Sequence, residues 1–275
     1  MEDRRALNPS VAPHSAIWEP FTQPRTGMRK LGVPPGGSWN PLFTSLLDQI
    51  EKPWIAGTVT ALGAASGAVL TSHVQTAWVV FGSPGRLVTD QGECDLPCFW
   101  AGRGEAHLVS DSGGRINIAA WPSLAPNLLG ILHDLEENGE QPIRCLALPG
   151  MGQILESCSW EVSPKSSRIG LRLVGKAPAM RALDASRPSA PGVIQAAGEG
   201  ELLVHGPDGP TTGGYPQLGS VIRADRGRLS EAPIGAAVRL QTVSVEEAKE
   251  AWRQETSRIS KAAKTIQELK RLGLV

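Results

Sequence analysis

Short apolar or alternating runs, each closed by Gly, Ser, Asp or Pro, fill most of this chain. In residues 168–173 the apolar side chains fall at every second position, which is the period of a strand with one buried face. Comparable runs bounded by turn residues predict further strands. These runs are GAVLTSHV (67–74), TAWVVFG (76–82), GRINIAAW (114–121), RCLALPG (144–150), ELLVHG (201–206), GSVIRAD (219–225) and AAVRLQTV (236–243).

Three segments show helical spacing instead. Asn40 is a good N-cap before Pro41, and apolar residues at i, i+3 and i+4 predict a helix that ends at Lys52. A second short helix is predicted over 127–137. The third begins with a capping box, Ser244 to Glu247, and continues to Leu272 with alternating charges. We expect this last helix to be long and mostly solvated, packing through Ala248, Trp252, Ile259 and Ile266.

Strands therefore dominate, and they do not alternate with helices. This pattern predicts a mainly β or α+β fold of barrel type and argues against a doubly wound nucleotide-binding fold. The chain has 31 Gly and 22 Pro among 275 residues, yet 41% of its residues are hydrophobic, so it is turn-rich and globular.

Charge and targeting signals narrow the function classes. The 27 basic and 27 acidic residues balance, so we expect neither a nucleic acid nor a membrane as partner. No apolar run approaches the length of a bilayer span, and the charged start has no secretory h-region. Four cysteines are too few for a disulfide scaffold. We expect a cytoplasmic protein.

Several catalytic signatures are absent or misleading. Leu70–His73 and Asp111–Gly114 imitate a serine protease, but His73 and Ser112 are only 39 positions apart, too few to build the intervening barrel strands. We therefore predict that His73 lies in a strand and that 110–114 is a tight turn between strands. No phosphate-binding glycine loop occurs. Cys94 and Cys98 lack a second ligand pair, and the five histidines are scattered, so no metal site is expected. We expect four of the five histidines to be structural or exposed.

Candidate chemistry lies between Ser166 and Leu240. In a strand over 166–173, Ile169, Leu171 and Leu173 share one face, and Arg168, Gly170 and Arg172 share the other. The two arginines could approach one anionic group across the glycine, or they could simply be solvated.

The run 208–216 offers a second cluster. Asp208 supplies a carboxylate, Thr211 and Thr212 supply hydroxyls, and Tyr215 is the single tyrosine of the chain. Gly213 and Gly214 permit conformations in which consecutive N–H groups converge on an oxygen anion. A tight hairpin with an Asx turn is an equally good interpretation.

Together these segments resemble one protein family. SSRIGLRL (166–173), PGVIQ (191–195), DGPTTGGYP (208–216) and VIRAD (221–225) resemble the pattern of allophanate hydrolase subunit 2 proteins. That family includes the C subunit of 5-oxoprolinase, the KipI antagonist KipA and the carboxyltransferase domain of urea carboxylase. The loop LGVPPGG (31–37) is similar to a family loop, whereas Asn40 stands where the family has an aspartate.

The resemblance implies two β-barrel-like subdomains, of which the C-terminal one is cyclophilin-like, followed by a C-terminal helix. On this basis we expect a flexible tail (1–15), an N-terminal subdomain (16–160), a C-terminal barrel (161–243) and a final helix (244–275).

The resemblance also implies a hydrolase component in a hetero-oligomer, whose partner is a KipI-like protein similar to the B subunit of 5-oxoprolinase. The complex would couple ATP hydrolysis, with Mg²⁺, to the opening of 5-oxoproline to glutamate, and the partner could bind most of the nucleotide. Arg168 and Arg172 would clamp oxygens, and Thr211, Thr212, Gly213 and Gly214 would form an oxyanion or phosphate nest. Gln195 and Tyr215 would orient the amide, and Asp208 would transfer a proton or orient a cation.

Two other functions stay open at this point. The chain could be a non-catalytic regulatory or binding module, because the N-terminal half departs from the family pattern. It could also be a biotin-dependent carboxyltransferase for urea-like substrates, although it has no Met-Lys-Met biotinylation site and would need a separate carrier.

Overall fold

The computed structural model describes residues 10–14, 16–20, 25–40, 55–62, 65–96, 98–121, 141–198 and 200–272. The chain divides into two compact units. The first consists of residues 1–21, 44–137 and 257–275, and the second of residues 22–43 and 138–256. The helices predicted over 41–52 and 127–137 lie outside the described residues.

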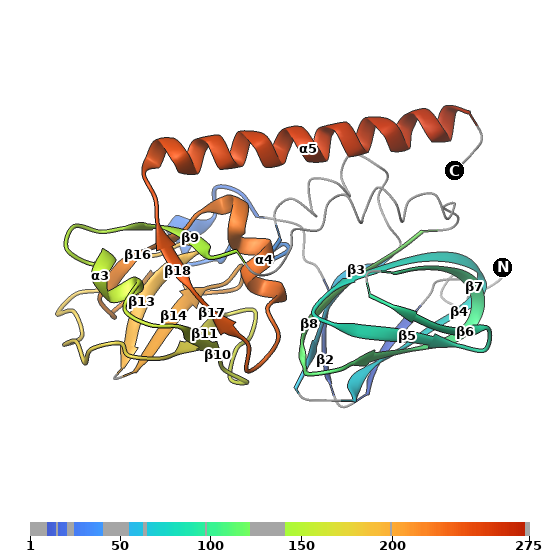
Figure 1. Ribbon diagram of the computed structural model, residues 1–275, viewed down its shortest axis with the longest axis horizontal. Coiled ribbons are helices and arrows are strands. Elements are labelled where there is room, and N and C mark those ends of the chain that lie inside the picture. The colour runs from blue at the N-terminus through green and yellow to red at the C-terminus, as the bar shows by residue number, and fades with distance from the viewer. Residues whose placement is uncertain are drawn as a thin grey trace. The chain divides into compact units, whose positions relative to one another are not determined.

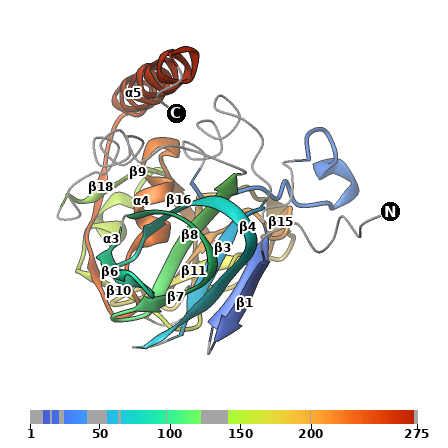
Figure 2. The ribbon, with the colours of Figure 1, turned by 90° about the vertical axis from the view of Figure 1, so that its right-hand side faces the viewer.

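The first unit is built on one antiparallel, barrel-like sheet (Figures 1 and 2), in the order β2-β3-β8-β4-β7-β5-β6 with β1 also paired to β4. Its strands are β1 (Ser10–His14), β2 (Ala16–Pro20), β3 (Ile55–Ala61), β4 (Ser66–Gly82), β5 (Gly85–Thr89), β6 (Gly92–Asp95), β7 (Cys98–Ser110) and β8 (Gly114–Trp121). The long strand β4 pairs with β1 along its first half and with β8 along its second. The core of this unit includes fully buried side chains from three strands: Val59, Leu70, Trp78 and Ile118.

The structure of this unit contradicts one prediction, the flexible tail, and confirms another, the turn at 111–114. Residues 10–14, expected in a flexible tail, form β1, and Pro13 fits there because it pairs opposite Ala68 in a strand for which β4 is the one partner among the described strands. The protease-like run 111–114 is the turn between β7 and β8, as predicted, and the hydroxyl of Ser110 accepts a hydrogen bond from the N–H of Gly113.

The second unit contains an eight-stranded sheet in the order β17-β10-β11-β14-β13-β16-β9-β18. Its strands are β9 (Ile143–Ala147), β10 (Trp160–Val162), β11 (Gly170–Val174), β13 (Val193–Gly198), β14 (Glu201–His205), β16 (Gln217–Val221), β17 (Ala237–Val238) and β18 (Leu240–Thr242). Only the β9–β18 pair is parallel among the described ladders of this sheet. A separate small sheet pairs β12 (Arg187–Pro188) with β15 (Thr212–Gly213). The fold is therefore mainly β, as predicted, whereas the cyclophilin-like character of this unit stays a prediction.

The second unit begins earlier in the chain than the predicted boundary at residues 160 and 161. Strand β9 pairs with β16 and β18, and β10 pairs with β11 and β17, so both belong to its sheet. The unit also includes residues 22–43, which fall in the predicted N-terminal subdomain. The local sequence of a short strand or a turn-rich segment does not indicate which sheet it joins, so the boundary between the two units could not be predicted from it.

The described residues also include four short helices: η2 (Arg29–Leu31), α3 (Gly152–Leu155), η3 (Arg223–Asp225) and α4 (Arg226–Glu231). The C-terminal helix α5 (Val245–Arg271) is the long helix in Figure 1. Its capping box is confirmed, since Glu247 accepts from the N–H and hydroxyl of Ser244 and donates its own N–H to that hydroxyl. The guanidinium of Arg223 lies 4.3 Å from the ring centroid of Trp252. Ile259 and Ile266 are buried as predicted.

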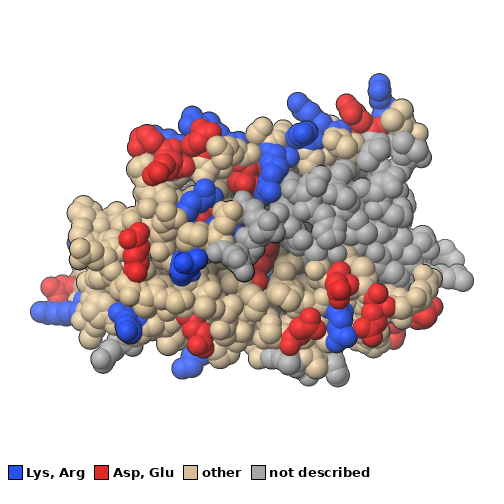
Figure 3. Space-filling model, in the orientation of Figure 1, with Lys and Arg blue, Asp and Glu red and all other residues tan. Residues whose placement is uncertain are grey.

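Figure 3 shows Lys and Arg interspersed with Asp and Glu on the face that it draws, in keeping with the equal numbers of basic and acidic residues. Among the helices of the described ranges, none is both long enough and apolar enough to cross a bilayer.

Candidate functional site

The motif segments of the second unit meet where β11 begins and β14 ends. Gly170 pairs with His205 across these two strands, and Gln195 on β13 pairs with Leu203 on β14. The run 208–213 follows shortly after β14. Its last two residues form β15, which pairs antiparallel with β12. Residues separated by up to 40 positions are thereby brought to one end of the sheet.

Arg168 and Asp208 form the first element of the site. Arg168 is only 3% exposed, and its Nε and Nη2 donate to the two carboxylate oxygens of Asp208 over 2.7 and 3.1 Å. The backbone adds a bond from the N–H of Asp208 to the carbonyl of Arg168. This two-point ion pair fixes the start of the TTGGYP segment to the start of β11.

The loop 25–40 docks on the same place. Nη2 of Arg168 donates to the carbonyl of Gly37 over 2.6 Å, and the N–H of Gly36 donates to the carbonyl of Pro207. A Cβ on Gly206 would lie 2.5 Å from the ring of Trp39, so the glycine permits this close packing. Asn40, in place of the family aspartate, donates to Glu231 of α4. The LGVPPGG resemblance in the N-terminal half thus belongs to this site.

Arg172 does not join Arg168. Its guanidinium pairs with Glu201, and both side chains are partly exposed. The strand starts at Gly170, after a tight turn in which Ser167 and Gly170 exchange backbone hydrogen bonds, so Ile169 is 58% exposed instead of buried. The expected clamp of two arginines on one anion is replaced by two separate internal ion pairs.

The run Thr211–Tyr215 is ordered by backbone pairing. The N–H of Ser189 donates to the carbonyl of Thr211, and Arg187 pairs with Gly213. Neither Gly213 nor Gly214 is among the glycines with positive φ, so the left-handed turn of an anion nest is not formed there. Thr212 and Tyr215 are exposed.

Gly213 is required for a different reason. A Cβ at this position would lie 2.6 Å from Nε2 of Gln195, whereas a Cβ on Gly214 would meet only the hydroxyl of Ser186, at 3.9 Å. Gly213 therefore allows the backbone to lie directly against the amide of Gln195.

Sequence reasoning missed the partners of Gln195. Its Oε1 lies 2.8 Å from Nε2 of His205, and Nδ1 of His205 lies 2.8 Å from the hydroxyl of Ser189. All three side chains are at most 2% exposed. A histidine ending an apolar strand directly before the TTGGYP run was the available signal.

Burial also sets the charge of His205. Removal from water lowers its pKa from the ordinary value and outweighs the opposite effect of a hydrogen bond to the backbone of Pro210. A buried imidazole with a lowered pKa is neutral at pH 7.

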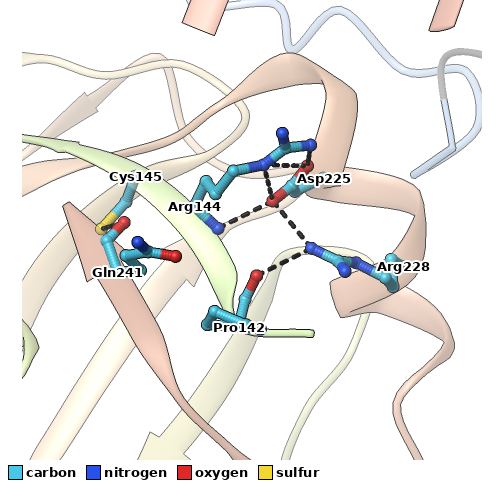
Figure 4. A network of polar contacts seen from close by, with 6 residues as sticks. All are labelled: Pro142, Arg144, Cys145, Asp225, Arg228 and Gln241. Atoms are coloured by element: carbon cyan, nitrogen blue, oxygen red, sulfur yellow. Dashed lines mark hydrogen bonds and ion pairs between the residues drawn. The ribbon is translucent and has the colours of Figure 1, made fainter. Parts of the chain in front are cut away.

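The VIRAD segment has a structural role. The Asp225 carboxylate, fully buried, accepts from the N–H, Nε and Nη2 of Arg144 and from Nη2 of Arg228 (Figure 4). Arg228 also donates to the carbonyl of Pro142. The network ties η3 and α4 to the start of β9.

The site offers little to a metal or a nucleotide. No group of three or more His, Cys, Asp or Glu side chains suited to a metal occurs among the described residues. A triphosphate needs free cationic donors, but Arg168 and Arg172 are both paired with carboxylates. The residues described at this site therefore do not fit ATP, and no step through ATP is assigned to them.

Comparison with known proteins agrees with this organisation. Residues 145–242 match the family "Carboxyltransferase domain, subdomain A and B". This range holds the motifs at 166–173, 191–195, 208–216 and 221–225, whereas the loop 31–37 of the same unit lies outside it. Over this range the chain is similar to the carboxyltransferase domain family, and the resemblance predicted from the sequence is confirmed.

The particular relatives are two bacterial proteins, each named as the C subunit of 5-oxoprolinase. The chain is 37% identical over 102 residues to that of Escherichia coli (strain K12), which is 36% of this chain and 32% of the relative. It is 30% identical over 96 residues to that of Haemophilus influenzae, covering 32% of this chain and 29% of the relative. The match thus spans about a third of each relative's length.

The fold extends the likeness over more of the chain. The structure of the Kluyveromyces lactis urea carboxylase aligns with 94% of this chain and 29% of its own, at a TM-score of 0.68 and 16% identity. At that identity the likeness concerns the fold alone.

Proposed function

We propose that this chain is a component of an ATP-dependent hydrolase of the 5-oxoprolinase type, which opens the cyclic amide of 5-oxoproline to glutamate. The two 5-oxoprolinase relatives support this, because their similarity to the chain and the family match point to the same kind of protein. The observation that carries the proposal is the buried amide of Gln195, whose Nε2 lies against Gly213 and has no hydrogen-bond partner among the described residues.

That amide suits the chemistry of lactam opening. Water adds to the carbonyl carbon, the C–N bond breaks, and the nitrogen leaves with a proton. Negative charge develops on the carbonyl oxygen, and a preorganised N–H donor in a dry site stabilises it. In this proposal Nε2 of Gln195 is that donor and the exposed hydroxyl of Tyr215 contacts the ring.

Asp208 takes a positioning role in place of proton transfer. Both of its carboxylate oxygens accept hydrogen bonds from Arg168, so they are engaged. Because the arginines are engaged as well, we assign ATP and Mg²⁺ to the KipI-like partner, the counterpart of the B subunit of 5-oxoprolinase.

The test is reconstitution of the full chain with a KipI-like partner, followed by measurement of ATP hydrolysis that depends on 5-oxoproline. Gln195→Ala should abolish this activity, and Arg181→Ala is the matched control, since Arg181 forms an exposed pair with Asp184. Full activity of the Gln195 variant would refute the assignment.

A regulatory or binding module is the second candidate. The internal pairing of Arg168, Asp208 and Arg172 favours it, because these groups already have partners within the chain. In the same reconstitution this module would bind the partner and leave ATP hydrolysis independent of 5-oxoproline.

A carboxyltransferase for urea-like substrates is the third. The family description and the urea carboxylase fold support it. It predicts carboxylation of urea by the chain only when a separate biotinylated carrier is added.

A further inference from the structure

We propose that Ser189 and His205 form a relay that holds the amide of Gln195 as a hydrogen-bond donor to the neutral carbonyl oxygen of a small amide bound beside Gly213. This inference rests on the proposed function and names two positioning residues for its site. It arises from three buried polar side chains, of which only Gln195 belongs to a sequence motif.

Strand pairing places Gln195 and His205 in one row. Gln195 lies opposite Leu203 in the β13–β14 ladder, and His205 is two residues further along β14, so both side chains project from the same face. Ser189 directly follows β12 and is held by its backbone bond to Thr211. The relay is therefore anchored in the sheet at one end and in the TTGGYP run at the other.

With Oε1 of Gln195 facing His205, the relay predicts one order of protons between the three side chains. Oε1 of Gln195 can only accept, so Nε2 of His205 carries the hydrogen. Nδ1 is then an acceptor and receives the proton of the Ser189 hydroxyl. This order requires a neutral imidazole, and burial of His205 favours that form.

The relay leaves one end open. With Oε1 bound to His205, the NH₂ group of Gln195 faces Gly213, where Nε2 is buried and has no acceptor among the described residues. Buried polar groups are nearly always hydrogen-bonded, so this donor can take the carbonyl oxygen of a ligand as its partner. Nη1 of Arg168, at the same end of the sheet, is another buried donor for which the described part of the chain offers no acceptor.

The charge balance selects the ligand class. Gln195, His205 and Ser189 are neutral, and the charge of Arg168 is compensated by Asp208. Such a site favours a neutral carbonyl oxygen over a phosphate. Access requires displacement of Gly213, which is held by a ladder of two residue pairs between β12 and β15, a small sheet separate from the eight-stranded sheet.

The experiment is NMR on the full chain labelled with ¹⁵N. The side-chain NH₂ signal of Gln195 is identified by its loss in Gln195→Glu, and the imidazole nitrogens of His205 by their loss in His205→Gln. We expect the Nε2–H tautomer at pH 7; a charged imidazole or the Nδ1–H tautomer would overturn the relay.

Two probes then separate this inference from the proposed function. A shift of the Gln195 NH₂ signal on addition of 5-oxoproline supports both. A shift with urea but not with 5-oxoproline supports the donor and contradicts the 5-oxoprolinase assignment. No shift with either amide overturns the donor.

Variants test the positioning role. Ser189→Ala should weaken binding of the responding amide by roughly two- to tenfold, the effect of one hydrogen bond, and should alter the His205 tautomer signal. Ser186→Ala, at an exposed serine three residues earlier, is the control and should change neither. An unchanged tautomer and affinity in Ser189→Ala would exclude the relay.

Discussion

Two buried polar networks of the second unit are centred on different groups, a carboxylate and an imidazole. Around Asp225, both carboxylate oxygens accept hydrogen bonds from Arg144, and Arg228 adds another (Figure 4). Around His205, a chain of two bonds ends at an amide whose Nε2 has no acceptor in the part of the chain that the structure describes. Both networks include residues from motifs of the family, so the motif alone does not separate them.

The difference separates structural residues from candidate binding residues. A carboxylate whose acceptors are used within the chain ties elements together and offers nothing to a ligand. A network with an open donor is destabilising by itself, and its retention is explained if a ligand completes it.

We expect the largest effect from a substitution in the Asp225 network. Asp225→Ala would leave Arg144 and Arg228 without their shared carboxylate and should lower the free energy of unfolding by about 3–5 kcal/mol. Urea denaturation measures this. Asp184→Ala removes an almost fully exposed pair and should cost less than about 1 kcal/mol. Equal losses in the two variants would contradict the structural role of Asp225.

The next prediction concerns a substitution beside Gln195, in the His205 network. Gly213→Ala brings a Cβ to 2.6 Å from Nε2 of Gln195, so the amide must move away from His205. Affinity for the amide probe should fall roughly tenfold in titration calorimetry, the effect of one hydrogen bond at the upper end of its range. Gly214→Ala makes only an ordinary contact and should bind normally. A normal affinity in both variants would remove Gln195 from the site.

A third prediction uses the pKa of His205. Because the folded pKa lies below the ordinary value near 6.5, the unfolded chain takes up a proton first as the pH falls. Its contribution to stability is therefore complete above pH 6.5 and decreases below it, by at most about 1.4 kcal/mol per pH unit. Urea denaturation of the wild type and His205→Gln between about pH 7.5 and 5.5, which brackets the ordinary pKa, should show a smaller slope for the variant. Identical slopes would show that His205 does not titrate in this way.

The smallest effect concerns Arg172. Its partly exposed pair with Glu201 should contribute less than about 1 kcal/mol, and Arg172→Ala should retain substrate turnover. Arg168→Ala, which removes a buried pair and the contact with Gly37, should cost more in thermal denaturation. Loss of turnover with unchanged stability in Arg172→Ala would restore the two-arginine clamp expected from the sequence.

The sequence predicted what local periodicity controls. The strand around Leu171 and Leu173, the turn at 111–114 and the capping box at Ser244 follow from neighbouring residues and are confirmed. It also predicted the family, from motifs in the second unit.

Pairings over long distances were not predictable. The partner of Arg168 is 40 residues away, and nothing local distinguishes Asp208 from another turn aspartate. His205 was counted with the scattered histidines because its partners come from β13 and from the end of β12. The exposure of Ile169 depends on where the tight turn ends, which alternation does not define.

The contact between Gly37 and Arg168 has a consequence for how the protein is made. The two residues are 131 positions apart, and the first unit contributes the intervening residues 44–137. At about 5–20 residues per second, a ribosome releases the loop on the order of ten seconds before its docking site exists. The second unit can therefore fold completely only late in translation. Until then, while residues 44–137 of the first unit are synthesised, the loop that contains Gly37 cannot dock on Arg168.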